Sequence, residues 1–277
     1  DGTRVEVADI DGDGVNDLVY YQQNIRFVGE SFVRPGNLTV LWGDCDERVN
    51  LWSDSEITVS NPFLSDMDVA DIDGDGNADI VMVVRDATAT NQYIQVYKGP
   101  DPTLLTAQQT LAVPLTNGLY TDMMLGHFGE TVTGGGFPGG GGIGDCEDLD
   151  IWLLRTPPYN TGVGTSVGHY DNMTVLEYDC LQGQFPNPMV SAPGVHEFKL
   201  DAQHNEPLYG IDIKDTDDNG EIDLIAAIDG LTGNISYAYG SGTSWNTQNY
   251  AYLGDFKGAS ITTVSYTHLT LPTRLSV

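Results

Sequence analysis

Aspartates recur along the chain at a spacing that suits a calcium ion. Three segments, beginning at Asp9, Asp71 and Asp215, follow the pattern D-x-D-x-D-G-x-x-D or a close variant of it. Calcium is a hard cation that takes roughly six to eight oxygen ligands in a flexible geometry. Alternate carboxylates can turn inward around such an ion, and the glycine at position 6 lets the chain reverse its direction. The spacing therefore predicts about three calcium sites.

The ligand set of each loop follows from position in the pattern. Positions 1, 3, 5 and 9 supply side-chain oxygens, and position 7 supplies a backbone carbonyl. The residues assigned to the metal are Asp9, Asp11, Asp13, Val15, Asp17, Asp71, Asp73, Asp75, Asn77, Asp79, Asp215, Asp217, Asn219, Glu221 and Asp223. Position 12 holds no ligand, which excludes an EF-hand, because that motif needs a bidentate glutamate there. A plain Asp/Gly turn is the competing interpretation, but clustered carboxylates would repel one another without a cation.

The loops belong to an internal repeat. Equivalent aspartates stand at Asp17, Asp79, Asp150 and Asp223, and each unit has room for four short strands. In the first unit, strands are predicted over 5–10, 17–21, 38–42 and 56–60. Repeated four-stranded units are typical of propeller blades, which protect their edges by radial repetition. We therefore predict an all-β fold, a β-propeller fragment of about four four-stranded blades plus the start of a fifth, with calcium-binding loops in the first hairpin of the blades.

The propeller fragment is expected over residues 1–263. Its blades are predicted at 5–62, 67–118, 123–202 and 209–250, and the next blade begins within 251–263. The third blade is degenerate and is expected to hold no metal, because His127 and Gly129 replace ligands and a glycine-rich insertion follows them. Residues 264–277 lose the acidic, glycine-rich character of the chain and resemble a translated sequencing adapter, so we treat them as a non-native tail.

The charge balance and the cysteines restrict the partners and the compartment. Asp and Glu outnumber Lys and Arg by 40 to 11, for a net charge of −29, whereas nucleic acids and anionic membranes bind clustered basic residues. No run of about 18 apolar residues is present to insert into a membrane. Cys146 and Cys180 fall side by side in a predicted antiparallel pair, so we predict a disulfide between them, which fits an oxidising compartment. Cys45 is then free or paired with sequence outside this chain.

A longer motif gives the repeat a family resemblance. The run Val-Ala-Asp-Ile-Asp-Gly-Asp-Gly occurs at Val7 and again at Val69, and each copy is followed by an Asp-Leu-Val or Asp-Ile-Val strand. It resembles the FG-GAP and VCBS repeats, which form the blades of integrin α-subunit propellers and of many secreted bacterial proteins. The resemblance covers about residues 5–260 and implies a secreted or cell-surface module that structural calcium makes rigid. It also implies adhesion, or recognition of an extracellular protein or carbohydrate.

An enzymatic role is the alternative interpretation. Related propellers are the scaffold or an accessory domain of secreted polysaccharide-active lyases and hydrolases, and the insertion at 130–147 could shape a substrate groove. The segment Gly164–Gly168 matches G-x-S-x-G, but that motif needs a strand before it and a helix after it, and neither is predicted here. We therefore assign no catalytic residue and favour a binding module over an enzyme.

Overall fold

The fold was analysed in a computed structural model of the 277-residue chain. The residues that it describes are 3–23, 26–28, 31–33, 36–43, 48–53, 62–86, 91–99, 107–114, 118–128, 149–156, 172–189, 192–199, 208–215, 222, 224–229, 235–241 and 244–250. Every regular element in these residues is a β-strand, so the all-β prediction is confirmed for the described part of the chain. No helix in this part is long and apolar enough to cross a membrane.

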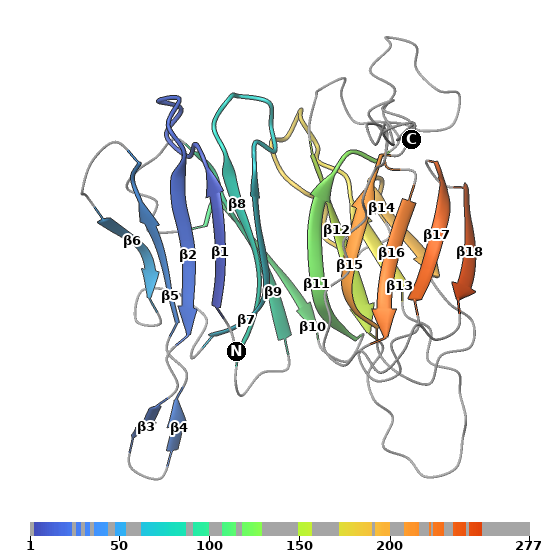
Figure 1. The fold of residues 1–277 in the computed structure, drawn as a ribbon, viewed down its shortest axis with the longest axis horizontal. Coiled ribbons are helices and arrows are strands. Elements are labelled where there is room, and N and C mark those ends of the chain that lie inside the picture. The colour runs from blue at the N-terminus through green and yellow to red at the C-terminus, as the bar shows by residue number, and fades with distance from the viewer. Residues whose placement is uncertain are drawn as a thin grey trace, which may run out of the picture.

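The strands form four antiparallel sheets of four strands each and one two-stranded hairpin (Figure 1). The first sheet contains β1 (Thr3–Ala8), β2 (Asp17–Gln23), β5 (Gly36–Leu41) and β6 (Arg48–Ser53), in that order. The hairpin of β3 (Arg26–Val28) and β4 (Ser31–Val33) projects from the end of this sheet opposite to the β1–β2 loop. The predicted strands of this unit agree with β1, β2 and β5. The fourth strand comes earlier than expected, and the predicted range 56–60 lies outside the described residues.

The other three sheets repeat the same up-and-down order. The second contains β7 (Pro62–Ala70), β8 (Asp79–Asp86), β9 (Asn91–Tyr97) and β10 (Gln109–Pro114). The third contains β11 (Leu119–Gly126), β12 (Asp150–Thr156), β13 (Asn172–Leu176) and β14 (Val195–Lys199). The fourth contains β15 (Leu208–Lys214), β16 (Leu224–Asp229), β17 (Ile235–Ser241) and β18 (Ser244–Tyr250). Each sheet is open, with a first and a last strand at its two edges.

The first strands of the four sheets lie next to one another in chain order: β1 contacts β7, β7 contacts β11, and β11 contacts β15. Strands β7, β11 and β15 each contain a register shift in the first half of the strand, at Ser65, Thr121 and Gly210. A bulge adds one residue to one strand of the pair and increases its local twist. The shared irregularity shows that the repeat extends to backbone details that the loop motif does not contain.

Apolar side chains fill the spaces between successive sheets. On β8, Ile80, Met82 and Val84 belong to the cluster shared with the first sheet, whereas Val81 and Val83 belong to the cluster shared with the third. A third cluster joins the third and fourth sheets through residues that include Trp152 and Ile213. The second and third sheets are therefore buried on both faces, which explains why their second strands are almost continuously apolar.

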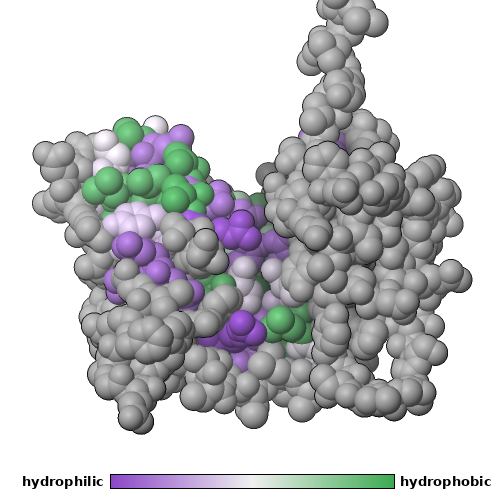
Figure 2. Space-filling view, turned by 60° about the horizontal axis from the view of Figure 1, so that its bottom comes forward, coloured by the Kyte–Doolittle hydropathy of each residue, from purple (hydrophilic) through white to green (hydrophobic). Residues whose placement is uncertain are grey.

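The first sheet differs on its outer side. Val5 and Val7 of β1 are 53% and 61% exposed, because no described residue packs over them. Elsewhere on the surface, Figure 2 shows hydrophilic residues gathered near the middle of one face, beside a group of hydrophobic residues. The described surface is thus mixed in polarity on that face.

Candidate metal centres

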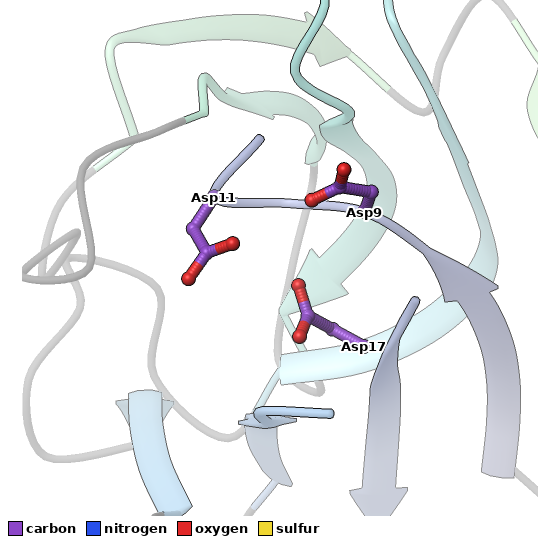
Figure 3. A group of neighbouring side chains, drawn as sticks. All are labelled: Asp9, Asp11 and Asp17. Carbon is purple, nitrogen blue, oxygen red and sulfur yellow. The ribbon is translucent and has the colours of Figure 1, made fainter. Parts of the chain in front are cut away.

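Two acidic triads lie in the loops that join the first two strands of the first and second sheets. In the first loop, the carboxylates of Asp9, Asp11 and Asp17 point toward one another (Figure 3). One oxygen from each lies within 4.8 Å of the others, and the same holds for the triad of Asp71, Asp73 and Asp79. Positions 1, 3 and 9 of the predicted motif therefore come together in both loops. Either triad could hold a metal ion.

Glycines with positive φ give the loops their shape. Gly12 and Gly14 have φ of 74° and 87°, and Gly74 and Gly76 have φ of 72° and 91°, a region that side chains with a Cβ rarely adopt. These turns let the backbone fold over the first aspartate. Asp9 accepts hydrogen bonds from the N–H groups of Gly12 and Gly14, both at 2.8 Å. The bonds fix the orientation of the first carboxylate before any ion is bound.

The aspartate at position 9 ties three strands together. Asp17 Oδ2 accepts from Ile10 N–H at 2.8 Å, just after β1, and Oδ1 accepts from Gly43 N–H at 2.9 Å, just after β5. Asp79 makes the same two contacts with Ile72 and Gly99. Because Asp17 and Asp79 begin the second strands of their sheets, each carboxylate joins the loop ends of strands one, two and three.

The third sheet has the same pair of hydrogen bonds, although its sequence has His127 and Gly129 at two of the ligand positions. Asp150 Oδ2 accepts from Phe128 N–H at 2.7 Å, and Oδ1 accepts from Tyr178 N–H at 3.0 Å. Asp150 is only 4% exposed. Position 9 therefore makes the same two backbone contacts in the first three sheets. The sequence assigned position 9 to the metal in the other loops but gave no role to Asp150, and its presence in the degenerate unit is the signal for these backbone contacts.

Other predicted ligands have different outcomes. Asp13 and Asp75 at position 5 are exposed, and each accepts a hydrogen bond from the backbone two residues later, at Val15 and Asn77. They are not part of the triads, and the carbonyl ligands at Val15 and Asn77 remain predictions. In the third predicted loop Asp215 is half-buried at the end of β15. The remaining residues of that loop, Asp217, Asn219, Glu221 and Asp223, lie outside the described residues.

The insertion and two cysteines also fall outside the described part of the chain. This applies to residues 130–147, to the G-x-S-x-G segment and to Cys45 and Cys146. Cys180 is disulfide-bonded. Its pairing with Cys146 remains a prediction.

Negative charge is crowded in both loops. Burial, together with the charges of Asp13, Asp17 and Asp9, raises the pKa of Asp11. Burial raises the pKa of Asp79 to about 7, although hydrogen bonds from Gly99 and Ile72 oppose the shift. In both cases the ionised form is disfavoured, and a bound cation would reverse that effect.

The residues present fit a hard cation. Every side-chain donor in the triads is a carboxylate oxygen, which is the ligand type that calcium and magnesium prefer over sulfur or imidazole. Asp73 Oδ1 is buried and has no hydrogen-bond partner among the described residues. An orphaned buried carboxylate oxygen is costly unless a positive group satisfies it.

The two loops touch each other. Ala78 N–H of the second loop donates to the Asp9 carbonyl of the first at 2.8 Å. Gly12 packs so closely that a Cβ on it would lie 2.0 Å from Asn77 Oδ1. The triads thus lie at the same end of neighbouring sheets, on loops that share a backbone hydrogen bond.

No protein-family model and no curated protein matches the chain. The resemblance to FG-GAP and VCBS repeats therefore continues to rest on the motif residues alone.

Side chains outside the loops join the sheets, and sequence reasoning missed them. Asp66 and Asp68 on β7 accept hydrogen bonds from Met123 and Leu125 on β11, at 2.8 and 2.9 Å. Asp122 on β11 accepts from the N–H of β15 residue 211 at 2.6 Å. The first two bonds span 57 residues and the third spans 89, so no fixed sequence separation could have found them.

Proposed function

We propose that the chain is a calcium-binding propeller module, in which each ion rigidifies the first hairpin of a blade. The observation that carries the proposal is the repeated triad, formed once on the first sheet and again on the second, with oxygens within 4.8 Å of one another. A single acidic cluster is common on protein surfaces. Two copies built by the same residues of a structural repeat favour a shared ligand.

The sheet arrangement supports a propeller. Four four-stranded antiparallel sheets follow one another along the chain, and their first strands are neighbours in the same order. Successive sheets pack face to face through apolar clusters. Blades around an axis have this connectivity, and the four sheets would form an arc of such a ring.

Calcium is assigned a structural role because of where the triads lie. Asp9 and Asp11 follow β1, and Asp17 begins β2, so an ion at the triad would hold these two strands together at the loop. An ion bound only by the folded chain stabilises it according to the logarithm of the free ion concentration. Extracellular modules bind calcium with dissociation constants of roughly 0.1–1 mM, which suits a secreted or cell-surface protein.

The module is proposed to serve adhesion or recognition of an extracellular protein or carbohydrate. Support comes from the motif resemblance and from the disulfide at Cys180, since stable disulfides form in oxidising compartments. The net charge of −29 also favours cationic ligands over nucleic acids.

Calorimetric titration of the full chain with calcium, with thermal melts in calcium and in EDTA, tests the proposal. We expect one binding step for each described triad, a further step from the Asp215 loop, and a higher melting temperature in calcium. Asp11→Asn and Asp73→Asn should each remove a different step. The absence of both heat and stabilisation, in a sample whose circular dichroism shows folded sheet, would mean that the loops are plain turns.

A further inference from the structure

A lysine lies against the second acidic triad. Lys98 Nζ is 2.8 Å from Asp73 Oδ2, and the two side chains are only 22% and 23% exposed. The ammonium therefore supplies a positive charge to a carboxylate that also belongs to the triad with Asp71 and Asp79. The ammonium group thus binds a carboxylate that a metal ion at this triad would also bind.

Contacts from the next sheet hold Lys98 in this position. Its ammonium donates a hydrogen bond to the hydroxyl of Tyr178 and lies 4.6 Å from the centre of that ring. Tyr178 follows β13, and its ring packs edge-on against Phe185 at 5.1 Å between centroids. The hydroxyl oxygen accepts this charge-assisted hydrogen bond and so stabilises the ammonium group. Lys98 is thus anchored on both sides.

In the described part of the chain, the first loop has no such group. Trp42 stands at the equivalent position, because the next residue, Gly43, bonds to Asp17 as Gly99 bonds to Asp79. Among the described residues, no lysine or arginine forms an ion pair with Asp9, Asp11 or Asp17. Two loops with almost the same sequence therefore differ in their charge surroundings.

We propose that Lys98 is an internal counter-cation that weakens calcium binding at the second loop and stabilises that loop when no metal is bound. The inference rests on the proposed calcium function. Calcium and the ammonium compete for Asp73, and two positive charges a few ångströms apart in a partly buried site repel each other. The two triads then fill at different calcium concentrations, the first at lower concentrations than the second.

Calorimetric calcium titration of Lys98→Met and Lys98→Arg tests this, with Asp73→Asn identifying the step that belongs to the second loop. We expect Lys98→Met to tighten that step by about tenfold, or about 1.4 kcal/mol of binding free energy. Lys98→Arg keeps the charge and should stay near the parent affinity. Lys199→Met, at the end of β14 away from the loops, removes the same charge elsewhere and should change nothing.

Thermal melts give a second readout. In EDTA, Lys98→Met should melt lower than the parent, whereas its gain on adding calcium should be larger. Lys98→Gln, which keeps a hydrogen-bond donor without the charge, replaces the methionine variant if that one folds poorly. A second-loop affinity within twofold of the parent in both neutral variants would overturn the role of Lys98 and leave the calcium proposal standing. No binding by any variant, parent included, would overturn both.

Discussion

The side chain of Gln92 pairs with both backbone polar groups of Tyr120. Its Nε2 donates to the Tyr120 carbonyl at 2.8 Å, and its Oε1 accepts from the Tyr120 N–H at 2.7 Å. Gln92 is completely buried on β9, and Tyr120 is on β11, so one amide links the second and third sheets. The amide thus satisfies the backbone polar groups of a residue on the edge strand of the third sheet.

Replacing Gln92 with leucine should be strongly destabilising. The substitution leaves the N–H and the carbonyl of Tyr120 buried without partners, at roughly 1–3 kcal/mol for each group. We expect the free energy of unfolding in urea to fall by about 2–4 kcal/mol. Gln95→Leu on the same strand is the control, since Gln95 is 3% exposed and its Oε1 has no partner among the described residues. If both variants lose equal stability, the pairing with Tyr120 is not what makes Gln92 important.

Substitutions at Asp150 and Asp11 distinguish the backbone hydrogen bonds of position 9 from metal binding. Asp150→Asn replaces one acceptor oxygen by an N–H₂ group, which would face a backbone donor at Phe128 or Tyr178. We expect a loss of about 2 kcal/mol, equal in calcium and in EDTA. Asp11→Asn leaves the two backbone hydrogen bonds of Asp17 in place and should reduce only the stability gained from calcium. Matched thermal melts in the two buffers measure both effects. A calcium-dependent loss for Asp150→Asn would contradict a purely structural role in the third unit.

The features that the sequence predicted correctly depend on residues that are close together in the chain. The positions of β1, β2 and the first triad follow from a motif within nine residues, Asp9 to Asp17, where turn glycines and alternating carboxylates act on their own neighbours. The missed features depend on distant partners: Lys98 meets Asp73 across 25 residues and Tyr178 across 80. Such contacts form where the chain packs sheet against sheet. The sequence repeat predicts this packing but not its individual side-chain contacts. The early position of β6 has the same origin, because pairing with β5 fixes it.

Stability should depend on pH through Asp66. Burial and the neighbouring carboxylate of Asp122 raise the pKa of Asp66 to about 9, against the opposing effects of Arg4 and the Met123 N–H. The native state then keeps a proton that the unfolded chain loses near pH 4. The stabilisation from this proton is complete below that pH and is lost as the pH rises toward about 9.

Burial also raises the pKa of Asp68 and of Glu6, which adds to the same trend. Urea unfolding in EDTA between pH 4 and 9 should show stability falling, on the order of a few kcal/mol. Asp66→Asn resembles the protonated acid and should flatten the curve. Parallel curves for the parent and this variant would show that Asp66 ionises normally in the folded protein.

Equivalent positions in the first and fourth sheets should differ in how much the same substitution destabilises the protein. Val7 and Ile213 each stand two residues before the first aspartate of their loop, yet Val7 is 61% exposed and Ile213 only 7%. Ile213 packs in the cluster between the third and fourth sheets, whereas the outer face of β1 has no described neighbour. Threonine keeps the β-branched shape at both sites, so strand propensity changes little.

We therefore expect Ile213→Thr to lower the free energy of unfolding by about 2–3 kcal/mol, through lost apolar burial and a buried hydroxyl. Val7→Thr should change it by less than about 0.5 kcal/mol, as exposed positions usually do. Urea titrations at one protein concentration compare the two variants, and sedimentation checks that the parent is monomeric. A large loss for Val7→Thr in a monomer would mean that the outer face of β1 is covered in solution. The exposure of Val7 would then not predict its contribution to stability.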